Sequence, residues 1–157
     1  MTDNNVENNV ENNEKTVDNL LESLNNIENS SIMNLTTSII MEHKNNILQK
    51  LNLERSILKK FHKKLKKYRY CSDLSDLQFG NYIRWISLKN PNKLFLTNGA
   101  FFSDYVYTKN TVKVVCRNNR GFTFQIKFDE VIIFQKLNKQ EEILLKDPSV
   151  KGFNIGT

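Results

Sequence analysis

Residues 58–70, LKKFHKKLKKYRY, bring seven Lys or Arg side chains and one His into thirteen positions. No Asp or Glu occurs between positions 55 and 72, so neighbouring cations on a helix would repel one another. A polyanion that neutralises these cations removes the repulsion and releases bound counterions. The segment therefore predicts contact with DNA or RNA. The predicted nucleic-acid-binding residues are Lys59, Lys60, Lys63, Lys64, Lys66, Lys67 and Arg69, with Arg84 from a later strand.

Two other interpretations of the basic segment stay open. It is similar to a nuclear-import address, and it also fits the solvated face of a helix that packs on something else. Membrane binding is not expected, because the apolar side of the helix lacks Trp and is needed for packing. The longest apolar run, VIIF at 131–134, is also far shorter than the roughly 20 residues of a membrane-spanning helix.

The cations alternate with apolar residues that recur in steps of three and four, apart from Glu54. From position 33 to 69 there is no Gly and no Pro. This spacing predicts one long basic amphipathic helix over residues 32–70. We expect its seam to be an interface with a partner helix, a second copy of the chain or the β domain. The predicted interface residues are Ile47, Leu51, Leu58, Phe61, Leu65 and Tyr68.

After a turn or linker at 71–80, short runs rich in aromatic and β-branched residues predict strands. The expected strands are 81–88, 94–97, 101–108, 111–117, 122–128 and 131–137. Asn98-Gly99 predicts a hairpin between the second and third of them. Asn138, with Glu141 three residues later, predicts a capping box that opens a short helix over 138–145.

The predicted fold is α+β: a long N-terminal helix, a small antiparallel β-barrel of SH3-like or OB-like size, and a short C-terminal helix. The expected regions are an acidic Asn-rich arm (1–31), the helix (32–70), the β domain with its C-terminal helix (71–147) and a tail (148–157). The arm carries seven acids and one Lys within a chain of net charge +6, and its repeat at 4–15 predicts disorder. Within it, residues 16–29 have apolar side chains at helical spacing, which predicts a short amphipathic helix that is stable against a partner.

Aromatic residues dominate the β domain, and core filling is the favoured role of its phenylalanines and of Trp85. A single-strand-binding surface is a further hypothesis, because such surfaces combine aromatic with basic side chains. Its candidates are Tyr82, Arg84, Tyr105, Tyr107, Lys113 and Arg117. A peptide-binding groove lined by Tyr82, Trp85 and Tyr107 is another, and it requires Trp85 to be accessible.

The sequence does not indicate catalysis. His43 and His62 lie nineteen positions apart, with no Cys, Asp or Glu placed to complete a metal site. Cys71 and Cys116 form no disulfide framework, which is typical of a reduced intracellular protein. We therefore predict a non-enzymatic protein with no metal, no cofactor and no small-molecule substrate.

The block that begins FGNYIRWISL and ends IIFQKL, residues 79–137, resembles small uncharacterised β-barrel proteins of large nucleocytoplasmic DNA viruses. The resemblance implies a viral origin, and with it a location in the host cytoplasm or nucleus or in the virion. Ala100 stands where a second Gly is usual. The residues that carry the resemblance are Gly80, Tyr82, Ile83, Arg84, Trp85, Leu96, Asn98 and Gly99.

Together these patterns predict a nucleic-acid-binding or polyanion-binding assembly protein. The alternative is a structural virion component whose helix is an oligomerisation interface without nucleic-acid binding. A further hypothesis is that the acidic arm shields the basic strip when no nucleic acid is present.

Overall fold

The computed structural model of the chain describes residues 35–146. The predicted arm, including the stretch 16–29, and the predicted tail lie outside these residues. The described chain contains six strands: β1 (Tyr68–Cys71), β2 (Tyr82–Ser87), β3 (Ala100–Thr108), β4 (Thr111–Arg117), β5 (Thr123–Lys127) and β6 (Val131–Lys136). It also contains the helices α3 (Thr37–Gln49), α4 (Arg55–Lys64) and α5 (Lys139–Lys146), and 3-10 turns at Leu74–Asp76 and Phe128–Glu130. The α+β class is thereby confirmed.

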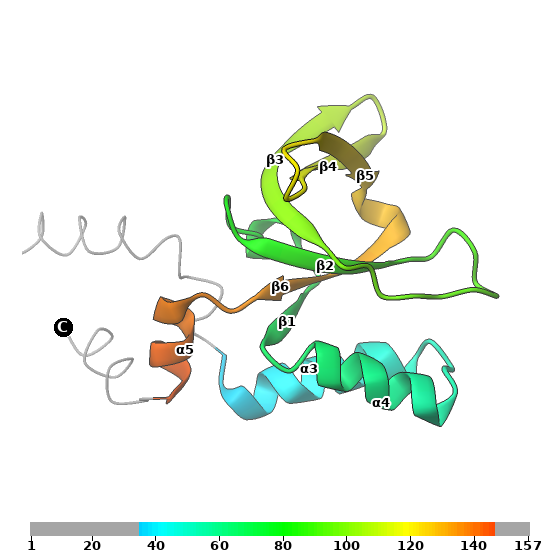
Figure 1. Cartoon of the computed structure of the whole chain (residues 1–157), viewed down its shortest axis with the longest axis vertical. Helices are drawn as coiled ribbons and strands as arrows, with labels where there is room; N and C mark the ends of the chain where they lie inside the picture. Colours follow the sequence, from blue (N-terminus) through cyan, green and yellow to red (C-terminus); the bar gives the residue numbers. More distant parts are fainter. Residues whose placement is uncertain (1–34, 147–157) are drawn as a thin grey trace, which may run out of the picture.

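The strands form one antiparallel sheet in the order β1-β6-β2-β3-β4-β5. Helices α3 and α4 lie beneath the half of the sheet built from β1, β6 and β2, and β3, β4 and β5 rise on the other side (Figure 1). Because β1 and β5 are edge strands that do not pair with each other, the sheet is open. The prediction of a closed barrel is wrong. Strand β1 was not predicted, and its partner β6 follows it by about sixty residues, so no local pattern indicates this pairing.

The prediction of one long helix over 32–70 is also wrong. Helix α3 ends at Gln49 and α4 begins at Arg55, and between them Asn52 adopts a φ of +52°. Asn tolerates this left-handed conformation better than most residues, so the chain turns here without Gly or Pro. Helix α4 ends before Tyr68 begins β1, which places the last residue of the predicted seam in the sheet.

The predicted hairpin at Asn98-Gly99 is wrong as well. Leu96 bridges to Ile86 and Ala100 pairs with Ile83, so residues 96–101 run beside β2 instead of folding back. Gly99 has a φ of +99°, and a Cβ atom there would overlap the carbonyl oxygen of Ile83. The glycine is therefore needed for close approach to β2, and the reversal itself occurs between β2 and Leu96.

The sheet carries a core on each face, because successive strand residues point to opposite sides. The helix-side core lies between the sheet and α3 and α4. Its buried members are Leu48, Phe61, Leu65, Tyr68, Ile86, Leu96, Ile132 and Phe134. The inner core lies on the other face, where β3, β4 and β5 contribute. Its buried members are Cys71, Leu77, Ile83, Trp85, Ala100, Phe102, Val114, Cys116 and Ile133.

The capping box of the C-terminal helix is confirmed. The backbone amide of Glu141 donates to Asn138 Oδ1 at 2.7 Å, and the amide of Asn138 donates to Glu141 Oε1 at 3.2 Å. Helix α5 therefore begins where the local pattern predicts. Its position closes a third small cluster, in which Ile40 and Leu144 are buried.

Candidate nucleic-acid interface

Helix α4 has one apolar side and one basic side. Phe61 and, just beyond the helix, Leu65 are buried in the helix-side core, while Ile57 and Leu58 pack against its edge. The lysines between them point away from the sheet, because residues three and four apart share a helix face. We call these lysines, together with Lys66 and Lys67 in the turn that follows α4, the basic face. It consists of Lys59, Lys60, Lys63, Lys64, Lys66 and Lys67.

All six side chains of the basic face are exposed. Among residues 35–146, the ion pairs involve Arg69, Lys89 and Lys127, and none involves a lysine of the basic face. Six uncompensated positive charges thus lie on one ten-residue helix and the turn that follows it. Such an arrangement binds phosphates through long, adaptable side chains.

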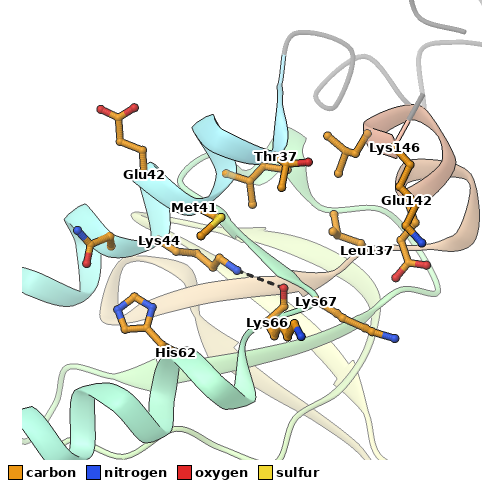
Figure 2. Close-up of a pocket in the computed structure, with 13 residues that line it drawn as sticks. Thr37, Met41, Glu42, Lys44, His62, Lys66, Lys67, Leu137, Glu142 and Lys146 are labelled. Carbon is orange, nitrogen blue, oxygen red and sulfur yellow. Dashed lines mark hydrogen bonds between the residues drawn. The ribbon is translucent and has the colours of Figure 1, made fainter. Parts of the chain in front are cut away.

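Lys44 supports the end of this surface, and sequence reasoning missed it. Its side chain is only 6% exposed, and its Nζ donates to the carbonyl oxygen of Leu65 at 2.8 Å. The same Nζ donates to the carbonyl oxygen of Lys66 at 3.5 Å (Figure 2). This contact satisfies a carbonyl at the C-terminal end of α4, where cations are favourable. Burial lowers the pKa of Lys44. The available signal was its spacing, since Lys44 lies four residues from both Ile40 and Leu48 on the buried stripe of α3.

His62 lies on α4 beside the basic face but is partly buried. Desolvation lowers its pKa, and the positive charge of Lys44 lowers it further. The imidazole is therefore neutral at pH 7, and the charge of the surface comes from its lysines.

Arg69 does not belong to the exposed surface, contrary to the sequence interpretation. Its side chain is 2% exposed, and its Nε donates to Glu141 Oε2 at 3.1 Å. It also donates to the carbonyl oxygen of Asp76 at 2.8 Å. Arg69 alternates with Tyr68 and Tyr70 along β1, so it points to the opposite side of the sheet from α3 and α4. Its role here is structural.

Arg84 is partly buried on β2, and its Nε donates to the carbonyl oxygen of Thr97 at 2.8 Å. It lies on the helix side of the sheet, between Tyr82 and Ile86 in the strand. Arg84 thus holds residues 96–98 against β2 and is not part of the basic face.

The predicted interface residues pack within one chain. Phe61, Leu65 and Tyr68 are buried members of the helix-side core, and Ile47, Leu51 and Leu58 pack against it. The seam therefore meets the protein's own sheet, which was one of the three partners expected for it. No second helix is needed to cover these six side chains.

The proposed aromatic and basic surface is divided between two faces of the sheet. The register shifts between Phe102 and Asp104, so Tyr105 and Tyr107 share the face of the inner core. Lys113 and Arg117 point to the other face. The sequence interpretation grouped these residues by their aromatic and basic character, which does not determine the face of the sheet on which each one lies.

Trp85 is 8% exposed and contacts Phe124 in the inner core, at a ring-centroid distance of 5.8 Å. The peptide groove that required an accessible Trp85 is therefore excluded. Phe79 was missed as a surface residue: it is exposed and stacks between Phe102 and Tyr105.

No group of three His, Cys, Asp or Glu side chains between residues 35 and 146 is placed to hold a metal ion. None of the helices in that range has the length and apolar character needed to cross a bilayer.

Comparison of the chain with protein-family models, with curated proteins and with solved structures found no match.

Proposed function

We propose that this chain is a non-enzymatic nucleic-acid-binding protein whose basic face contacts the phosphate backbone. The observation that carries the proposal is the set of six exposed lysines that have no acidic partner among the described residues. Phosphates would neutralise this cluster and release counterions to solution. The apolar side of α4 is held by the helix-side core, so the lysines are presented from a fixed support.

Salt dependence provides the test. We expect the full chain to bind a duplex DNA oligonucleotide with an affinity that falls steeply between 50 and 200 mM salt, roughly linearly on a log–log scale. Changing Lys59, Lys60, Lys63 and Lys64 to Gln should weaken binding and reduce the slope by about one unit for each phosphate that is no longer neutralised. Fluorescence anisotropy at five or more salt concentrations measures both quantities, and RNA is tested in parallel.

A matched control separates the basic face from net charge. Lys93, Lys109, Arg117 and Arg120 are also exposed, and changing these four to Gln removes the same charge from loops and strand ends away from α4. The proposal requires a clearly larger reduction of the slope for the α4 variant. Equal reductions in both variants, or no binding at low salt, would contradict it.

The alternative function is a structural assembly component. The sequence based it on the helix seam, but the observation that favours it is a group of exposed aromatic side chains. Three exposed aromatics form a contiguous row, in which Phe79 stacks on Tyr105 of β3 and Tyr105 contacts Tyr107 of the same strand. Such rows are common in protein–protein contacts. Under this alternative, Tyr105→Ser with Tyr107→Ser would abolish self-association measured by sedimentation. The virion role implied by the resemblance would use the same row.

A further inference from the structure

A groove of about 880 Å³ opens between α3, the end of α4, the end of β6 and α5. Figure 2 shows its two walls, with Thr37 and Met41 on one side and Leu137, Glu142 and Lys146 on the other. Its volume is at the upper end of the range for ligand pockets. The groove adjoins the basic face, because Lys66 and Lys67 line its rim.

Apolar side chains form much of the groove. Ile40 is buried at its base, and Leu137 and Leu145 are half-buried beside it. Met41 lines the groove and remains 61% exposed. An exposed thioether in an apolar groove is typical of a surface that adapts to an amphipathic partner.

The rim of the groove is positively charged. Four lysines line it, Lys44, Lys66, Lys67 and Lys146, against the two acids Glu42 and Glu142. An occupant with acidic residues and aliphatic side chains would complement this surface.

The chain outside the structure leaves from the walls of the groove. Leu35, the first described residue, packs against the cluster of Ile40 and Leu144. The 34 residues before it therefore join the described chain beside the groove. Residues 30–34 span at most about 20 Å when extended. A segment tethered this closely has an effective concentration in the millimolar range.

Residues 16–29, TVDNLLESLNNIEN, have the matching chemistry. Asp18, Glu22 and Glu28 are acidic, and the segment contains no Lys or Arg. Its five aliphatic residues fall on one side of a helix. They are Val17, Leu20, Leu21, Leu24 and Ile27.

From these observations we propose that residues 16–29 dock as an amphipathic helix in the groove between α3 and α5 of the same chain. The aliphatic side faces Ile40, Met41 and Leu145, and Asp18 and Glu22, on the flank of that side, lie near the lysines of the rim. The proposal does not depend on nucleic-acid binding, and its test contains no nucleic acid.

The C-terminal residues 147–157 also leave from the groove, at Lys146, but fit it less well. They carry one Asp and one Lys, so they offer no net charge to the lysines of the rim. Pro148, Gly152 and Gly156 also oppose a regular helix there. Charge complementarity therefore favours the N-terminal segment.

Crosslinking in the full chain tests the docking. In one variant, Leu24→Cys on the aliphatic side is combined with Met41→Cys on the groove wall. In the matched control, Asn26→Cys on the opposite side of the same helix is combined with Met41→Cys. The native thiols Cys71 and Cys116 do not compete, since burial raises the pKa of each to about 12. A short bismaleimide is added at pH 7, and intact mass identifies crosslinked monomer.

We expect a several-fold higher yield of crosslinked monomer for the Leu24→Cys pair, although Asn26 is closer to Met41 in sequence. Adding Leu20→Asp to that pair should reduce the yield to the level of the control, whereas Asn19→Asp, with the same charge on the polar side, should not. Equal yields for the two pairs would overturn the proposal. Crosslinked dimers would instead assign the groove to a second copy, and a higher yield for Phe153→Cys with Met41→Cys would assign it to the C-terminal segment.

Discussion

Arg69 and Glu141 illustrate how a residue's chemistry depends on where its neighbours are placed. In sequence, Arg69 is the last cation of a basic run. In the structure, its guanidinium forms a buried ion pair with a residue 72 positions later. Removing the carboxylate from a buried ion pair removes a charge-assisted hydrogen bond in a site that water does not reach, which is unfavourable.

We expect Glu141→Gln to lower the free energy of unfolding by about 2 kcal/mol, the typical value of a hydrogen bond to a charged group. Gln can still accept the capping-box hydrogen bond from Asn138, so the change isolates the effect of the charge. Urea denaturation measures the effect. Glu130→Gln is the matched control, because Glu130 pairs with the exposed Lys89 and Lys127 and its substitution should cost less than about 1 kcal/mol. Equal costs for the two substitutions would contradict this explanation.

Gly99 provides a second test at the level of one residue. Gly80 and Gly99 both have positive φ, at 83° and 99°, but only Gly99 lies against backbone. Gly80→Ala should therefore show only the conformational penalty of about 1 kcal/mol. Gly99→Ala adds an overlap with the Ile83 carbonyl and should lower thermal stability markedly more. Similar melting temperatures for the two variants would mean that residues 96–101 do not lie against β2 as described.

At the level of elements, the turn between α3 and α4 decides how the basic segment is presented. A single helix over 32–70 would leave its apolar seam exposed for a partner. In the observed pair of helices, α3 and α4, the seam packs against the sheet of the same chain. Asn52, at the turn, discriminates between these arrangements because the two require opposite backbone conformations there.

We expect Asn52→Gly to leave stability unchanged or slightly raised, and Asn52→Ala to lower it by about 1 kcal/mol. In a continuous helix the order would be reversed, because Ala is the better helix former by about 1 kcal/mol. Urea denaturation of both variants shows the order directly. Greater stability of Asn52→Ala would contradict the turn.

The strands were largely predictable, because alternation and turn residues are local signals. Predicted strands at 101–108 and 111–117 match β3 and β4 within one residue, and 122–128 and 131–137 contain β5 and β6. The failures have a common origin in non-local contacts. Residues 68–71 form β1 because they pair with β6. Residues 94–97 do not form a separate strand, and only Leu96 among them bridges to β2.

At the level of the whole molecule, charge is distributed unevenly along the chain. Residues 1–31 carry seven acids and one Lys, a net charge of −6, which offsets half of the net charge of +12 on the remaining residues. Opposite charges linked in one chain attract at low ionic strength, and the attraction weakens as salt screens it.

If the basic face binds DNA as proposed, deleting residues 1–31 should raise DNA affinity at low salt. The increase should shrink toward physiological salt, because screening removes the competing attraction. Anisotropy titrations of both proteins at two salt concentrations measure it. Unchanged affinity at low salt would exclude shielding by the acidic residues.

The sequence by itself determined the α+β class, most strand positions, the capping box at Asn138 and the concentration of positive charge in residues 58–70. These properties depend on residue type, short-range spacing and backbone preference, which act within a few positions. Only the tertiary structure decided that the seam covers the chain's own sheet, that Arg69 is buried, that Lys44 supports the end of α4 and that the sheet stays open. Each of these depends on which distant segments pack together, and burial and long-range hydrogen bonding set that choice across the whole chain.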